Sequence, residues 1–253
     1  VRDLGGTNYR VASVDFESKI PVIHPENGWK RELSEMKNPG FTEEDLFKAM
    51  TDPVTSLKIT RKMPIGYCFS YPAESLPDGD ARLIQWTKGV NIEEMIGKEV
   101  GKPLMDYMNK ANGSKFTNIK VINDTVASLF AGLTQKYDAY IGLIVGTGTN
   151  MATFMHVDKI KKLSSIQSSG MLIPINLESG NFHPPHLTSV DNIVDACSDK
   201  PGTQRFEKAV SGMYLGEILK FVYPYDELEK KFDAERVTTI MNYPDIHKRR
   251  YVR

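Results

Sequence analysis

Two short glycine turns carry the polar groups that a phosphate could use. They are DLGGTN at residues 3–8 and GTGTN at residues 146–150. A bound phosphate needs several inward-pointing backbone N–H groups, close approach without a Cβ atom, and hydroxyl donors. Either turn alone is better explained as a tight hairpin, because glycine accepts positive φ. The presence of two turns of similar chemistry in one chain favours phosphate binding. Neither turn is a Walker loop or a GxGxxG sequence that opens a helix, so any nucleotide site would be formed by hairpins.

Asp124 is a candidate general base. It ends the apolar run NIKVIND (118–124) and precedes the helical pattern TVASLFAGL (125–133). Aspartate is favoured as a helix N-cap, and the helix dipole would keep its carboxylate ionised. Such a carboxylate can also accept a hydroxyl proton, so the structural and the catalytic interpretation are compatible. Asn123 beside it adds amide donor and acceptor groups.

Several isolated polar residues have the side-chain types that bind a polyol. Charged and amide groups hold hydroxyls through several hydrogen bonds in fixed geometry. Taken singly, each is explained by an ordinary turn or surface position, so spacing alone does not assemble a sugar pocket. These residues are Ser70, Thr87, Lys88, Glu178 and Glu217.

The first half of the chain predicts the elements that would position these groups. RVASVDF (10–16) is a strand with Ala12, Val14 and Phe16 on one face, followed by an irregular, turn-rich stretch over 17–40. Thr42 with Asp45 resembles a capping box at the start of a helix. Residues 64–72 read as a strand leading into a turn, 83–91 as a strand or loop, and 103–111 as a helix.

The second half predicts a similar mixture. Residues 140–155 read as strand, glycine turn and strand, and 206–222 as one long helical stretch. The tail after Pro224 is charged and weakly patterned. Strands and helices alternate irregularly, which predicts an α/β or α+β fold.

Composition excludes several classes of partner. Of the 253 residues, 40% are apolar and 25% charged, and the 32 basic residues balance the 32 acidic ones. This balance predicts no nucleic acid and no membrane surface as partners. The apolar runs fall short of the roughly 20 residues that a membrane helix needs. Two cysteines without metal spacing favour a reducing, cytoplasmic setting, and nothing indicates an oligomer, although one is possible.

Six segments in order over residues 1–219 resemble the hexokinase family. DLGGTNYRV and GLIVGTGTN resemble its two phosphate motifs. FSYP with LIQWTKG resembles its sugar-binding signature, and VINDTV resembles the segment with its catalytic aspartate. INLESGNF and QRFEKAVSGMYLGEI resemble the later segments that supply sugar-binding glutamates. The resemblance says little about residues 223–253.

The resemblance implies a two-domain α/β fold, actin-like and ribonuclease-H-like, with a central cleft. Residues 1–124 would form the smaller domain, with the first phosphate hairpin, the sugar-binding loops and the catalytic aspartate at its end. Residues 125–253 would belong to the larger domain, with the second phosphate hairpin and the sugar-binding glutamates. The family's N-terminal helical region and later adenosine segment are not found here, so we expect the chain to be incomplete at both ends.

The resemblance also implies an activity: transfer of the γ-phosphoryl group of ATP to the 6-hydroxyl of glucose or a related hexose, the first step of glycolysis, with Mg²⁺. Asp124 would be the general base, and Lys88 would orient the sugar and stabilise charge. The hexose would be bound by Ser70, Thr87, Lys88, Asn123, Asp124, Asn150, Glu178 and Glu217. The phosphates would be bound by Asp3, Gly5, Gly6, Thr7, Asn8, Arg10, Gly146, Thr147 and Gly148, with Asp3 facing the metal through water.

Two alternatives share these motifs. The chain could be a non-catalytic sugar sensor that keeps the cleft, or a sugar kinase of the same fold for another hexose. The presence of all the assigned polar residues argues against lost catalysis.

Arg2 departs from the pattern of the family, which usually has a small or apolar residue at that position.

Overall fold

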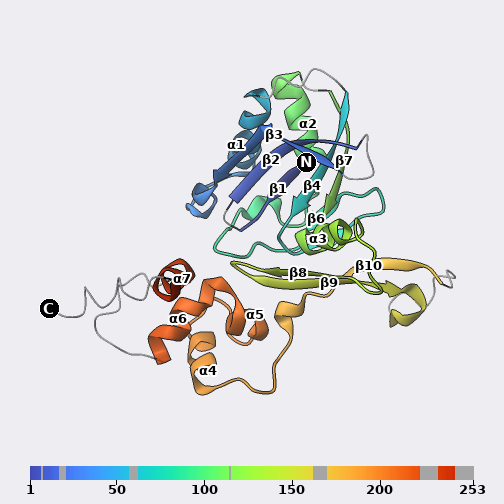
Figure 1. The fold of residues 1–253 in the computed structure, drawn as a ribbon. Coiled ribbons are helices and arrows are strands. Elements are labelled where there is room, and N and C mark those ends of the chain that lie inside the picture. Colours follow the sequence, from blue (N-terminus) through green and yellow to red (C-terminus); the bar gives the residue numbers. More distant parts are fainter. Residues whose placement is uncertain are drawn as a thin grey trace. The chain divides into compact units, whose positions relative to one another are not determined.

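The computed structural model describes residues 1–6, 8–16, 21–56, 62–113, 115–161, 170–222 and 233–242. The chain divides into two compact units, Val1–Gly142 and Leu143–Arg253. Both contain helices and strands, so the mixed α/β class is confirmed (Figure 1). The two compact units divide after Gly142, so the helix that begins at Asp124 belongs to the first unit. The predicted domain boundary after residue 124 stays a prediction.

A five-stranded sheet forms the first unit, in the order β3-β2-β1-β4-β7. β1 pairs with β2, and β2 with β3, in antiparallel fashion, whereas β1 and β4, and β4 and β7, run parallel. Leu4 lies opposite Phe69 and Cys68 lies opposite Ile122, so the three parallel strands end at the same level. The strands are β1 (Arg2–Leu4), β2 (Asn8–Asp15), β3 (Val22–Glu32), β4 (Met63–Phe69) and β7 (Phe116–Ile122).

Helices α1 (Glu43–Ser56) and α2 (Lys102–Asn112) pack against each other and against the sheet of this unit (Figure 1). The predicted capping box is confirmed, because the Asp45 carboxylate accepts from Thr42 N and the Thr42 hydroxyl accepts from Asp45 N. Helix α3 (Asp124–Gly132) follows β7. The shorter elements are η1 (Ser34–Lys37), β5 (Ala73–Ser75), β6 (Ala81–Leu83) and η2 (Glu93–Met95).

The core of the first unit extends into an aromatic cluster beside the ends of the strands. On β4 the alternate residues Tyr67 and Phe69 are buried, as the period of a strand requires. Phe69, Tyr71 and Trp86 are in mutual ring contact, with centroids 4.7–5.9 Å apart. Trp86 Nε1 also donates to the Ile92 carbonyl at 2.8 Å. Burial of each large ring contributes about 1.5–3 kcal/mol, so the loop around residue 86 is firmly anchored to the sheet.

The strand predicted over residues 10–16 is confirmed as part of β2, in which Tyr9 and Val11 are buried, and Phe16 follows the strand and is 72% exposed. The prediction for residues 17–40 is wrong over 22–32. The stretch predicted to be irregular contains the strand β3, because the edge of β2 offers it a partner.

The turn-forming residues of β3 are accommodated without ending the strand. Trp29 pairs with Val11 and His24 with Ser13, so residues 25–28 form an irregularity in the ladder. β3 is an edge strand, where proline is tolerated.

The second unit has a three-stranded sheet in the order β10-β9-β8 and a group of helices. The predicted strand, turn and strand over 140–155 are confirmed. The long helix predicted over 206–222 is two helices, because the backbone at Ser211 is extended. The elements are β8 (Ile141–Val145), β9 (Thr149–His156), η3 (Val157–Lys159), β10 (Leu172–Asn176), η5 (Ser179–Asn181), α4 (Ser189–Ala196), α5 (Arg205–Val210), α6 (Gly212–Val222) and α7 (Ala234–Asn242).

Among the helices in the described ranges, none combines the length and the apolarity needed to cross a bilayer.

Arg2 is a buried charge in the core of the first unit, with 3% of its surface exposed. Its Nη1 donates to the Tyr9 hydroxyl and to the Met50 carbonyl, but within the described residues its Nη2 has no hydrogen-bond partner. Burial accordingly lowers the pKa of Arg2. The Tyr9 hydroxyl also donates to the Met50 carbonyl, so this carbonyl keeps a donor if Arg2 is replaced.

We therefore expect Arg2→Met to raise the free energy of unfolding by about 1–3 kcal/mol, because it removes a buried charge at similar volume. Urea unfolding of the two chains measures the difference. Arg10→Met is the control on the same hairpin, and we expect it to change stability by no more than about 0.5 kcal/mol. A less stable Arg2→Met chain would contradict this view of Arg2.

Candidate active site

The candidate catalytic groups lie at the carboxyl ends of three parallel strands. The turn at Gly5 and Gly6 follows β1, Ser70 follows β4, and Asp124 follows β7. Ser70 N donates to the Leu4 carbonyl at 3.2 Å, which joins the first two strand ends directly. In open α/β sheets, ligands bind outside the carboxyl ends of the strands. The sheet therefore places these residues where a ligand would bind.

Three of the predicted site residues are joined by hydrogen bonds. The Ser70 hydroxyl donates to Asp124 Oδ2 at 2.7 Å, and Lys88 Nζ donates to the Ser70 carbonyl at 2.7 Å. The Lys88 ammonium also lies 5.3 Å from the centre of the Tyr71 ring, a cation–π contact. A carboxylate, a hydroxyl and an ammonium are thus held together, although they are far apart in the sequence.

Asp124 is not the helix N-cap that the sequence predicts. The cap of α3 is Asn123, whose Oδ1 accepts from Thr125 N at 2.9 Å. Asp124 is the first residue of the helix, and its Oδ1 also accepts from Thr125 N at 2.9 Å. Because Asn123 performs the capping, the Asp124 carboxylate stays at the positive end of the helix.

The pKa of the Cys68 thiol is affected by two carboxylates near the end of its strand. Burial, followed by the nearby charges of Asp3 and Asp124, raises the pKa of the Cys68 thiol to about 11. The thiol is therefore neutral near pH 7 and is not an activated nucleophile. Its neighbours Asp3 and Asp124 supply the negative charge of this region.

Lys88 occupies a strained turn. Val90 N donates to the Thr87 carbonyl at 3.2 Å, and the residues between them, Lys88 and Gly89, have φ of 61° and 80°. Two successive residues of positive φ define a type I′ turn, in which a residue other than glycine costs about 1–2 kcal/mol. Backbone strain of this kind concentrates at functional sites. Thr87 is half-buried at the start of the turn.

The first glycine turn is confirmed as a hairpin, with Gly5 N donating to the Asn8 carbonyl at 3.0 Å. Gly5 and Gly6 do not have positive φ, so the reason for glycine here is space. A Cβ atom on Gly6 would lie 2.6 Å from Lys88 Cδ. The turn thus makes room for the lysine stem. Thr7 lies outside the described residues, and the binding of phosphate by this turn stays a prediction.

Asp3 and Arg10 form an ion pair across this hairpin. Arg10 Nη1 lies 2.6 Å from Asp3 Oδ2, and the two residues are opposite each other in the ladder. In the described part of the chain, no three His, Cys, Asp or Glu side chains gather as a metal cage. Mg²⁺ is commonly held by one or two carboxylates together with substrate phosphates and water. Asp3 fits that arrangement as a single carboxylate.

A chain of hydrogen bonds connects two predicted hexose ligands within the second unit. Asn150 Nδ2 donates to Asn176 Oδ1 at 2.7 Å, and Asn176 Nδ2 donates to Glu178 Oε1 at 2.6 Å. Glu178 has φ of 49°, a second strained backbone position. Sequence reasoning missed Asn176, whose only signal is an amide two residues before Glu178. Glu217 pairs with Lys220 of the same helix at 2.8 Å.

The second glycine turn is held by two helices of its own unit. Gly146 N donates to the Gly148 carbonyl at 2.8 Å, and Gly212 N at the start of α6 donates to the Gly146 carbonyl at 2.7 Å. Thr149 N donates to Glu207 Oε2 at 2.8 Å. Sequence reasoning also missed Glu207, which carries no local signal because its partner lies 58 residues away.

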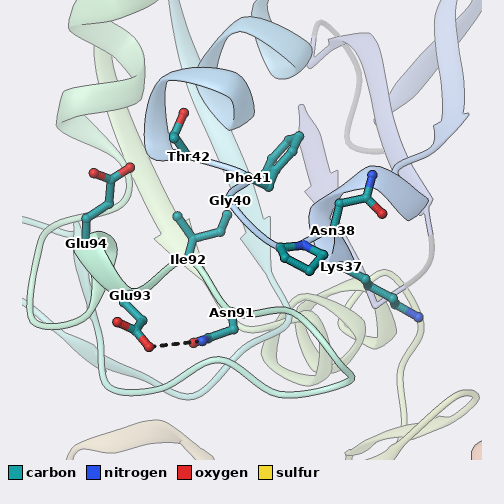
Figure 2. Close-up of a pocket in the computed structure, with 10 residues that line it drawn as sticks. Lys37, Asn38, Gly40, Phe41, Thr42, Asn91, Ile92, Glu93 and Glu94 are labelled. Atoms are coloured by element: carbon teal, nitrogen blue, oxygen red, sulfur yellow. Dashed lines mark hydrogen bonds between the residues drawn. The ribbon is translucent and has the colours of Figure 1, made fainter.

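A pocket of about 560 Å³ opens elsewhere on the first unit, between residues 37–42 and 91–94. Figure 2 shows Glu93 and Glu94 on one side of it and Lys37 on the other. Asn91 Nδ2 donates to Glu93 Oε1 at 3.3 Å within its wall. Its lining contains none of the predicted site residues, so this pocket is separate from the ends of β1, β4 and β7.

Comparisons with known proteins agree with the motifs. Two family models, both described as hexokinase, match residues 1–134 and 140–233. Hexokinase-2 of Arabidopsis thaliana is 34% identical over 260 residues, covering 96% of this chain and 51% of the relative. The hexokinase of Kluyveromyces lactis is 35% identical over 234 residues, covering 87% of this chain and 48% of the relative.

A solved structure, the hexokinase from Schistosoma mansoni complexed with glucose, aligns with a TM-score of 0.72 and 31% identity. The alignment covers 87% of this chain and 51% of that one. The chain therefore spans about half the length of the curated relatives that it matches.

The contact between Gly6 and Lys88 predicts a specific energetic coupling. We expect Gly6→Ala to cost about 1–2 kcal/mol of folding stability, because the added methyl group displaces a lysine stem anchored at Ser70. In a Lys88→Ala background the same change should cost less than about 0.5 kcal/mol. Urea unfolding of the wild type, both single variants and the double variant measures the coupling, and additive costs would show that the lysine does not set the requirement for glycine.

Proposed function

The chain belongs to the hexokinase family, and from this premise we propose that it transfers the γ-phosphoryl group of ATP to the 6-hydroxyl of glucose or a related hexose. The observation that carries the proposal is the hydrogen-bonded set of Ser70, Lys88 and Asp124 at the strand ends. Glucose is the favoured hexose because it is the ligand of the similar Schistosoma mansoni structure.

Asp124 is the general base of the proposed reaction. Its carboxylate takes the proton of the 6-hydroxyl as that oxygen bonds to the γ-phosphorus, and the bond to ADP breaks. A base within hydrogen-bond reach contributes about 10²–10⁴-fold to the rate. The Ser70 hydroxyl already donates to this carboxylate, which shows that Oδ2 accepts from a hydroxyl in this geometry.

Lys88 orients the hexose and offsets negative charge near the transferred group. Its ammonium is fixed by the Ser70 carbonyl and the Tyr71 ring, so little reorganisation is needed during the reaction. The further hexose ligands remain predictions supported by their side-chain types. They are Ser70, Thr87, Asn123, Asn150, Glu178 and Glu217.

The two glycine turns are proposed to hold the phosphates of ATP. When bound, Mg²⁺ neutralises charge on the phosphate oxygens, and Asp3 would face it through water. Arg10, now paired with Asp3, would supply positive charge beside the same hairpin. The proposed phosphate ligands are Asp3, Gly5, Gly6, Thr7, Asn8, Arg10, Gly146, Thr147 and Gly148.

A cytoplasmic location of the protein is expected from the cysteine usage alone and stays a prediction.

A coupled assay of ADP release tests this function. We expect release from MgATP to depend on added hexose, with glucose or a close relative as the best acceptor. Identification of the 6-phosphate product confirms the acceptor oxygen. Glucose binding without any hexose-dependent ADP release would instead support a non-catalytic sugar sensor.

We predict that Asp124→Ala lowers kcat by about 10²–10⁴-fold while glucose binding stays detectable, because the variant loses a proton acceptor but keeps the other hexose ligands. Asp124→Asn keeps the shape of the side chain and should be equally slow. Quenching of tryptophan fluorescence measures glucose binding, since Trp86 adjoins Thr87. Asp106→Ala, an exposed change on α2, is the control. Near-normal turnover of Asp124→Asn would remove the assigned base.

A further inference from the structure

Tyr71 contacts two separate parts of the candidate site in the first unit. Its side chain is buried, with 2% exposed, and its hydroxyl donates to the Gly5 carbonyl at 3.3 Å. The centre of its ring lies 5.3 Å from Lys88 Nζ, and this ammonium is anchored at the Ser70 carbonyl. Tyr71 therefore connects the turn that is proposed to bind phosphate with the lysine that is proposed to orient the hexose.

The ring of Tyr71 has a fixed position. Its centroid lies 4.7 Å from that of Trp86, edge to face, and 5.3 Å from that of Phe69. The preceding residue, Ser70, donates its amide to the Leu4 carbonyl at 3.2 Å, which holds this part of the chain beside β1. Burial raises the pKa of the Tyr71 hydroxyl, so the group stays a hydrogen-bond donor near pH 7. A buried tyrosine hydroxyl normally requires a partner, and here the partner is a carbonyl of the glycine turn.

The first glycine turn contains a peptide group whose direction its own residues do not determine. Gly5 and Gly6 are adjacent, and glycine has more backbone freedom than any other residue. Gly5 N donates to the Asn8 carbonyl at 3.0 Å, which fixes the amide before this pair. The next peptide group joins the Gly5 carbonyl to the Gly6 amide, and the Tyr71 hydroxyl holds it through the carbonyl.

The geometry of the peptide group relates this carbonyl to the amide that follows it. The peptide group between Gly5 and Gly6 is planar and trans, so its N–H points opposite to its C=O. The bond that draws the Gly5 carbonyl toward the buried hydroxyl therefore directs the Gly6 N–H away from Tyr71. An outward N–H in a glycine turn is a donor of the kind that binds phosphate oxygens. An unpartnered buried hydroxyl is unfavourable, which opposes rotation of this peptide group.

We propose that Tyr71 is a positioning residue for the binding of MgATP: its hydroxyl directs the Gly6 amide toward a phosphate oxygen. This inference rests on the proposed function, in which the turn at residues 3–8 binds phosphate. The ring and the hydroxyl have separate roles, because the ring supports Lys88 and the hydroxyl supports the turn. Tyr71→Phe keeps the first role and removes the second.

Calorimetric titration of the 253-residue chain with MgATP and, separately, with glucose tests the role. We expect Tyr71→Phe to weaken MgATP binding about fivefold, as loss of one hydrogen bond of ordinary net strength would, and to leave glucose affinity within about twofold. Tyr9→Phe is the matched control and should alter neither affinity, because the Tyr9 hydroxyl is also buried but donates to the Met50 carbonyl. Unchanged MgATP affinity in Tyr71→Phe, or an equal loss in Tyr9→Phe, would overturn the proposal.

The residual dipolar coupling of the Gly6 N–H bond separates this inference from the proposed function, since it depends on the direction of that bond and needs no ligand. We expect Tyr71→Phe to reduce the coupling to about half or less, because the released glycine peptide samples several directions. The couplings of Tyr9 and Val11 in β2 should stay at their wild-type values. An unchanged Gly6 coupling would refute the role of the hydroxyl even if the wild type binds MgATP. Failure of the wild type to bind MgATP would refute the phosphate role of the turn, and with it the proposal, whatever the couplings.

Discussion

The parallel pairing of β1, β4 and β7 is the constraint on which the candidate site depends. Because Leu4 lies opposite Phe69 and Cys68 opposite Ile122, the residues that follow each strand emerge at one edge of the sheet. This register makes the hydrogen bond between Ser70 and Asp124 possible across 54 positions of the chain. A shift of one residue in either ladder would turn the side chains to the opposite face and separate the proposed base from its partners.

In each unit a glycine leaves room for a charged side chain beside a proposed phosphate turn. The charge of that side chain is positive in the first unit and negative in the second. In the first unit the lysine stem of Lys88 passes Gly6, and in the second the carboxylate of Glu207 passes Gly148. Neither glycine needs a left-handed backbone. The absence of a side chain at these glycines therefore lets a residue distant in sequence pack against each turn. It would also allow a phosphate to approach the backbone closely.

The sequence predicts what depends on neighbouring residues and misses what depends on distant ones. The capping box at Thr42, both hairpins, the family and the candidate base Asp124 follow from local motifs and their order. At the break at Ser211, Gly212 N donates to the distant Gly146 carbonyl, a contact that no helical period reveals. β3 forms by pairing with the edge of β2, which lies before it in the chain. The N-cap of α3 is Asn123, one residue before the Asp124 that the sequence predicts. Glu207 and Asn176 were missed for the same reason, since their roles come from contacts in space.

The central claim is that the ends of β4 and β7, with Lys88 beside the turn that follows β1, belong to one hexose site. Titration of the isotope-labelled chain with glucose, followed through backbone amide resonances by NMR, tests it most directly. The amides of Gly6, Ser70, Lys88 and Thr125 are predicted to shift together and to yield a single dissociation constant. Shifts confined to the pocket at residues 37–42 and 91–94, with those four amides unchanged, would contradict the claim.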